Sequence, residues 1–90
     1  MTPARRAKLE AGIHLIDRAR DREAIDQFAW ASAQNALIGI GARFIRGDPN
    51  QMRFAGISTS CTHCDGKTLM VRWREKAVSI IEGETPMKPT

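Results

Sequence analysis

The chain has 90 residues, a net charge of +4, 42% hydrophobic residues and 27% charged residues. This length supplies one domain, and the balance of apolar and charged residues excludes a wholly disordered chain. Most of its 14 basic residues are arginine rather than lysine. Because the planar guanidinium pairs with phosphate or carboxylate through a fork of donors, such a surface suits recognition of anionic groups.

The first predicted element is a helix over residues 3–19. Thr2 followed by Pro3 is a typical helix start, because the hydroxyl caps the helix and the first turn does not need the N–H that proline lacks. Leu9, Ile13 and Ile16 then recur at helical spacing with charged residues between them. This narrow apolar stripe predicts a helix that lies on the surface of the core.

A second helix is predicted from about residue 21 to residue 46. Apolar residues occur on nearly every side of it, which is typical of a buried central helix and places Phe28 and Leu37 in the core. Gly39 and Gly41 each cost about 1 kcal/mol inside a helix. They indicate a kink or the close approach of a neighbouring backbone.

The second half of the chain is rich in β-forming residues, and we predict strands over residues 53–60, 67–73 and 77–81. The expected fold class is therefore α+β, with two N-terminal helices packed on a small three-stranded antiparallel sheet. The alternative is an all-α three-helix domain, because Trp73 and Ala77 also match helical spacing, with Thr68 as the N-cap. Whether residues 67–82 form strands or one helix stays open at this point.

We expect residues 1–84 to form a single compact domain and residues 85–90, which lack periodicity, to form a disordered tail. No apolar segment follows the basic residues near the N-terminus, so a secretory signal is not expected. The apolar stretch over residues 36–42 is too short to span a bilayer. A cytoplasmic location with no membrane partner follows as an expectation.

The segment Cys61-Thr62-His63-Cys64-Asp65-Gly66 carries the sharpest local motif. Two cysteines three positions apart beside a glycine-containing turn resemble a zinc knuckle, in which a tight turn lets two thiolates converge on one metal. The resemblance covers six residues and implies zinc as a cofactor, with Cys61, Cys64 and His63 as candidate ligands. A structural zinc needs four ligands. Two copies of the chain sharing one zinc, as a homodimer, would supply four thiolates, and Asp65, His63 or His14 would complete a site within one chain. The remaining interpretations are a redox-active or disulfide-bonded cysteine pair, and cysteines in a turn that bind nothing.

A second candidate site is basic. If residues 67–73 form a strand, Arg72 and Arg74 lie on the face opposite Leu69, Val71 and Trp73. Such a sheet face would meet phosphates or the carboxylates of a partner, and the competing interpretation is a solvated surface. The candidate binding residues are Arg53, Lys67, Arg72, Arg74 and Lys76.

No phosphate-binding glycine loop, metalloprotease motif or nucleophile elbow occurs in the chain, so we expect a protein that is not an enzyme. The first hypothesis is a small basic binding module that docks on a nucleic acid or on a nucleic-acid-handling protein complex. The second is a stoichiometric protein inhibitor or adaptor of phage type, for example one like an anti-CRISPR protein, that acts on host machinery. The third is a metal-knuckle or redox protein centred on the cysteine pair.

Overall fold

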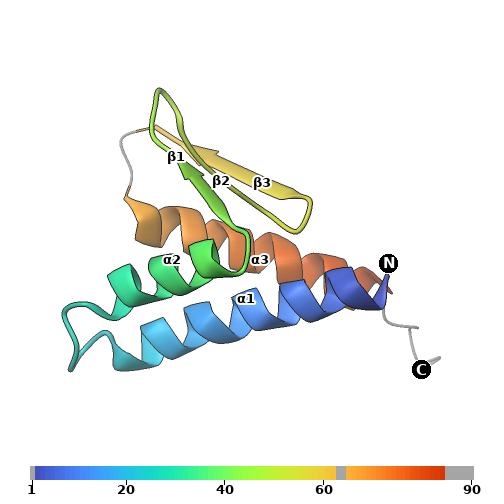
Figure 1. Cartoon of the computed structure of the whole chain (residues 1–90), viewed down its shortest axis with the longest axis horizontal. Coiled ribbons are helices and arrows are strands. Elements are labelled where there is room, and N and C mark those ends of the chain that lie inside the picture. Colours follow the sequence, from blue (N-terminus) through green and yellow to red (C-terminus); the bar gives the residue numbers. More distant parts are fainter. Residues whose placement is uncertain (1, 63–64, 85–90) are drawn as a thin grey trace.

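A computed structural model describes residues 2–62 and 65–84. Their helices and strands follow in chain order as α1 (Pro3–Arg22), α2 (Ala29–Gly39), β1 (Arg43–Ile45), β2 (Asn50–Phe54), β3 (Ile57–Cys61) and α3 (Gly66–Glu84) (Figure 1). The predicted α+β class with two N-terminal helices and a three-stranded antiparallel sheet is confirmed. The all-α alternative is not favoured, because the sheet is present. The predicted tail, residues 85–90, lies outside the described residues.

Helix α1 begins where the sequence predicts. The Thr2 hydroxyl accepts a hydrogen bond from the backbone N–H of Arg5 at 3.2 Å, and Pro3 occupies the first turn. Leu9 and Ile16 are fully buried, so the predicted apolar stripe is the face that packs on the core. The helix runs on to Arg22, three residues beyond the predicted end.

The single long helix predicted over residues 21–46 is wrong. Residues 21 and 22 belong to α1, α2 ends at Gly39, and Gly41 adopts a positive φ of 111°, which a residue with a Cβ adopts only at a cost. The chain then enters β1. The two glycines therefore mark the end of the helix and not a kink within it, and residues 43–45 pair with β2 instead of extending α2.

The sheet has the order β1-β2-β3, and both pairs of strands are antiparallel. The strand predicted over residues 53–60 is interrupted at Ala55 and Gly56, which have φ values of 53° and 79°. Two central residues with positive φ are typical of a type I′ hairpin turn. The Arg5 Nε–H donates to the Ala55 carbonyl at 3.0 Å and ties this turn to α1.

The strands predicted over residues 67–73 and 77–81 are also wrong, because both segments lie in helix α3. The alternating residues that indicated a strand also fit a helix whose buried side carries Leu69, Met70, Trp73 and Ala77. Asp65 caps this helix, since its Oδ1 accepts hydrogen bonds from the backbone N–H of Thr68 at 3.0 Å and from the Thr68 hydroxyl at 3.1 Å. Asp65, and not the predicted Thr68, is therefore the capping residue.

Trp73 lies at the centre of the core, between α1 and the sheet. Its ring centroid is 5.4 Å from that of Phe54, and its indole N–H donates to the Phe54 carbonyl at 3.0 Å. On the other side the ring packs against Gly12, where a Cβ would lie only 2.4 Å from the tryptophan. Absence of a side chain at Gly12 thus allows α1 to approach α3 closely.

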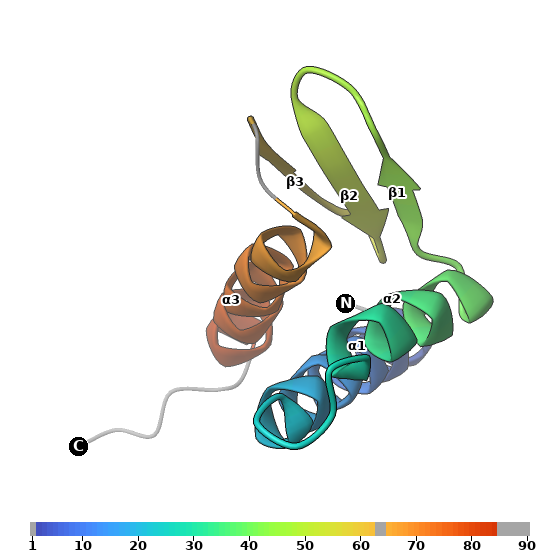
Figure 2. The ribbon, with the colours of Figure 1, turned by 90° about the vertical axis from the view of Figure 1, so that its left-hand side faces the viewer.

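The three helices lie side by side, and the sheet covers them on one side only (Figure 2). The turn between β1 and β2 stands farthest from the helices (Figure 1). No helix in the described ranges has the length and apolar character that a membrane crossing requires. Because all three helices pack on the same face of the sheet, no described element covers its other face.

Candidate nucleic-acid interface

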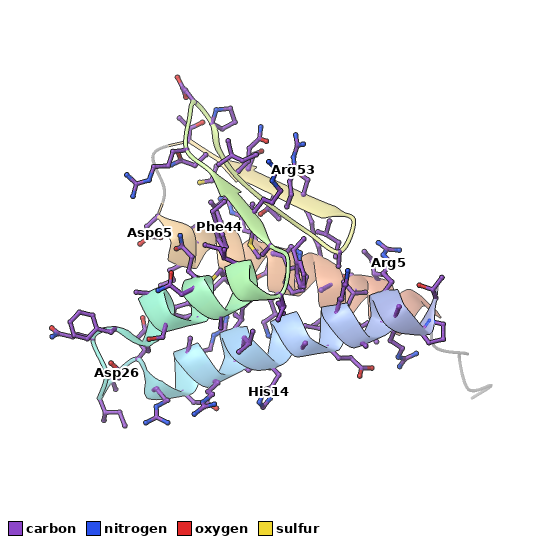
Figure 3. The ribbon with its side chains drawn as sticks, viewed as in Figure 1. Arg5, His14, Asp26, Phe44, Arg53 and Asp65 are labelled. Atoms are coloured by element: carbon purple, nitrogen blue, oxygen red, sulfur yellow. The ribbon has the colours of Figure 1, made fainter. Side chains whose placement is uncertain are left out.

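The uncovered face of the sheet is formed by side chains that alternate with buried ones along each strand. Met52, Phe54, Ile57 and Thr59 are buried against the helices, so their neighbours in sequence point the other way. Figure 3 shows Arg53 pointing away from the helices and Phe44 toward them. We call this uncovered surface the outer sheet face, and it consists of Arg43, Ile45, Gln51, Arg53, Ser58 and Ser60.

The strand register arranges these six residues in two rows that cross the sheet. Arg43 is the Cα partner of Arg53, which in turn pairs with Ser58. In the second row, Ile45 pairs with Gln51, and Gln51 pairs with Ser60. Side chains opposite each other on one face of an antiparallel pair are about 5 Å apart at Cβ. The outer sheet face therefore brings two guanidinium groups together beside amide and hydroxyl groups.

Two basic side chains from α3 lie at the open edge of β3 and extend these rows. The Lys76 ammonium donates to the Ser58 carbonyl at 2.9 Å, and Arg72 Nη1 donates to the Ser60 carbonyl at 3.2 Å. They are four positions apart on the helix, so both emerge from the same side of α3. These contacts satisfy carbonyls that an edge strand would otherwise expose and place one cation at the end of each row.

The electrostatics of the outer sheet face favour an anionic partner. None of the three strands contains Asp or Glu. Like charges directly opposite each other destabilise a sheet, and Arg43 faces Arg53 in this way. Arg53 Nη2 donates to Gln51 Oε1 at 3.3 Å, whereas the guanidinium of Arg43 makes no hydrogen bond or ion pair with another described residue. Both guanidinium groups therefore keep donors free for a ligand.

Acidic residues occur beside this surface but not on it. Glu75 lines the groove between the edge of β3 and α3, together with Arg72 and Lys76. Asp48 lies in the turn that joins β1 to β2, next to exposed Arg46. An anion on the outer sheet face would therefore contact the two rows directly, while the Glu75 carboxylate disfavours its extension into the groove.

The five predicted binding residues do not form one surface. Arg53 lies on the outer sheet face, and Arg72 and Lys76 lie at its edge, but α3 is a helix and turns the other two residues elsewhere. Arg74 pairs with both carboxylate oxygens of Asp17 on α1, at 2.5 and 3.4 Å. This pair joins two helices and leaves Arg74 partly buried, so its position indicates a structural role.

Lys67 also lies away from the sheet face. It pairs with Glu23 after α1, and its ammonium lies 5.4 Å from the centroid of the Trp30 ring. The hydrogen bond from Lys67 holds the pKa of Glu23 below its usual value. Lys67 therefore joins the start of α3 to the region between α1 and α2, and it does not lie on the sheet face.

Zinc binding by the cysteine motif, residues 61–66, stays a prediction. Cys61 ends β3 and is disulfide-bonded, while His63 and Cys64 lie outside the described residues. Because zinc is held by thiolates, binding by this pair would require the reduced form. His14 is exposed on α1 and points away from Asp65 (Figure 3). Among the residues that the structure describes, no three His, Cys, Asp or Glu side chains gather as metal ligands would.

The sequence interpretation missed Arg43, Gln51, Ser58 and Ser60 as members of one surface. Arg43 is predicted in a helix, and Ser58 and Ser60 in a strand whose two expected neighbours, residues 67–73 and 77–81, are helical in the structure. The signal that could have found them is the pair of short alternating runs around Phe44 and residues 51–54, on either side of a turn that contains glycine and proline. That pattern is typical of a hairpin.

Comparison of the chain with protein-family models, with curated proteins and with solved structures finds no match. Function therefore has to be inferred from the residues of the site.

Proposed function

We propose that this protein is a small binding module that recognises nucleic acid through its outer sheet face. The observation that carries the proposal is the opposition of Arg43 and Arg53 on an uncovered sheet whose strands contain no carboxylate. Phosphate contacts from Arg and Lys supply most of the affinity of nucleic-acid-binding proteins. Arg72 and Lys76 add two cations at the edge of the same surface. The proposal includes a cytoplasmic location and no catalytic step.

Salt titration of binding tests the proposal. Fluorescence anisotropy with labelled nucleic acids of mixed sequence should show a log–log dependence of affinity on salt, with a slope of about −0.9 for each phosphate neutralised on duplex DNA. In the variant Arg43→Ala/Arg53→Ala, we expect weaker binding and a slope that is less negative by about 2. Loss of two positive charges from the surface that faces the nucleic acid, and of the counterion release that they cause on binding, is the physical reason.

A matched control keeps the change in net charge the same. Arg18 and Arg22 are exposed on α1 and line the groove between α1 and α2, away from the sheet. Arg18→Ala/Arg22→Ala should bind almost as the unchanged protein does. If both double variants weaken binding equally, only overall charge matters and the outer sheet face is not the site. If the unchanged protein binds no nucleic acid at low salt, the proposed function is wrong.

A second candidate function, a stoichiometric inhibitor or adaptor, is supported by a different part of the molecule. Ile25 and Phe28, in the turn between α1 and α2, are 83% and 63% exposed. Exposed apolar side chains that cluster in one place commonly mark sites of protein association. This candidate is favoured if the protein binds no nucleic acid but forms a complex of fixed stoichiometry with one protein after nuclease treatment.

A further inference from the structure

The residue types on the outer sheet face distinguish one class of nucleic acid from the others. Proteins that read single strands stack unpaired bases on exposed aromatic side chains. The chain has three Phe and two Trp and no Tyr, and none of these five lies on the outer sheet face. Phe54 and Trp73 are buried, and Phe44 packs against the core. The surface therefore lacks stacking platforms for unpaired bases.

Hydrogen-bonding side chains take the place of aromatic ones on this surface. The guanidinium of arginine donates two hydrogen bonds to O6 and N7 of guanine, and the amide of glutamine pairs with N6 and N7 of adenine. Arg43, Arg53 and Gln51 supply these groups, and Ser58 and Ser60 add hydroxyl groups that hydrogen-bond to several bases. All of these base atoms lie on the edges that the major groove of duplex DNA exposes.

The shape of the β1–β2 hairpin fits the same groove. The major groove of B-form DNA is about 12 Å wide and admits a two-stranded β-ribbon. Strands β1 and β2 form a hairpin within the three-stranded sheet, with β3 paired to the other side of β2, and their turn stands farthest from the helices (Figures 1 and 2), so the helices do not block its approach. With Arg43, Gln51 and Arg53 over the bases, Arg72 and Lys76 lie beside the ribbon at the edge of β3, where the rim of the groove carries phosphates.

We infer that the β1–β2 hairpin reads the major groove of double-stranded DNA, with Arg43 and Arg53 as the guanine-contacting residues. This inference rests on the proposed function and adds the class of nucleic acid and the mode of recognition. Duplex RNA is disfavoured because the major groove of an A-form helix is too deep and narrow for protein side chains to read. Arg72 and Lys76 contact phosphates and contribute affinity without sequence preference.

The test begins with selection of a binding site from a random duplex DNA library, in which we expect guanine-containing sites to be enriched. The selected duplex is then prepared with 7-deazaguanine, which lacks the N7 acceptor of the major groove and leaves the backbone and the minor groove unchanged. Loss of one good base contact should weaken binding between about fivefold and 150-fold. Single-stranded DNA and duplex RNA of the same sequence should bind more weakly than the unmodified duplex.

Conservative variants separate base reading from charge. Arg43→Lys/Arg53→Lys keeps both charges but loses the two-pronged donor geometry. It should lose affinity for the selected duplex by a similar factor and become insensitive to 7-deazaguanine. Lys76→Ala, in contrast, should weaken binding to the selected and to unrelated duplexes equally. Circular dichroism of each variant verifies that the fold is retained.

Each other outcome is decisive. Failure of any site to be enriched, an absence of any effect of 7-deazaguanine, or a preference for single strands or RNA overturns the major-groove inference and leaves the proposed nucleic-acid function standing. Absence of binding to every nucleic acid overturns both.

Discussion

The turn between α1 and α2 and the middle of α3 use their aromatic residues in opposite ways. Phe28 immediately precedes the apolar helix α2 and is 63% exposed, so its predicted place in the core is wrong, whereas Trp73 lies among charged residues and is completely buried. The turn is at one end of two antiparallel helices, where no described element covers the Ile25 and Phe28 side chains. The middle of α3 lies between α1 and the sheet. Burial therefore depends on what surrounds an element and not on how apolar its sequence is.

Substitution of the two aromatic residues is the strongest test of this comparison. Trp73→Ala removes the largest fully buried side chain and leaves the Phe54 carbonyl without its donor, so we expect a loss of about 3–5 kcal/mol in the free energy of unfolding. Phe28→Ala should change it by at most about 0.5 kcal/mol, because the side chain is mostly in solvent already. Urea unfolding of both variants measures the difference, and a loss of equal size at the two positions would contradict this packing.

Glycine substitutions test the close approach of α1 to α3. In Gly12→Ala the new Cβ would lie 2.4 Å from a Trp73 ring atom, and the ring is held by its hydrogen bond to Phe54. We expect a loss of about 1–3 kcal/mol from overpacking. Gly39→Ala, at the end of α2, is the matched control, because no atom lies within 4 Å of the added Cβ. It should leave stability unchanged or raise it by up to about 1 kcal/mol. Thermal unfolding measures both variants. Equal changes in the melting temperature of Gly12→Ala and Gly39→Ala would show that α1 and α3 lie farther apart than this packing requires.

The start of α3 gives the smallest expected effect. Asp65→Ala removes the cap and should cost about 0.5–2 kcal/mol at neutral pH. The backbone N–H of Thr68 holds the pKa of Asp65 below its usual value, so the stabilisation is complete above the unfolded pKa of about 3.9 and disappears as the pH falls through the lower folded pKa.

The control at this position is Asp65→Asn, which keeps an oxygen acceptor for Thr68 and removes the titrating group. At neutral pH the free energy of unfolding of Asp65→Asn should lie close to that of the unchanged protein. The difference in this free energy between Asp65→Asn and Asp65→Ala should stay the same in acid. Thermal unfolding at neutral and acidic pH measures both. A cap contribution in the unchanged protein that persists undiminished in acid would show that the charge of Asp65 does not contribute.

Features that depend on residues close together in the chain can be predicted from the sequence. The α+β class, the start of α1 at Thr2 and Pro3, and the burial of Leu37 could all be predicted, since capping and periodicity act within one or two turns of the chain. The charge of Arg53, Lys67, Arg72, Arg74 and Lys76 made them binding candidates, and their binding stays a prediction. A glycine pair between two apolar runs could also have indicated the end of α2.

Which residues share a surface depends on packing and strand pairing between distant parts of the chain. Residues 67–73 satisfy both a strand pattern and a helix pattern, and packing of Trp73 between Gly12 and Phe54 selects the helix. That choice turns Arg74 toward Asp17 and leaves Arg72 at the edge of β3. Arg43 meets Arg53 through strand pairing, ten residues apart along the chain. Cross-strand contacts depend on register, which local sequence patterns specify weakly until one face of the sheet is buried.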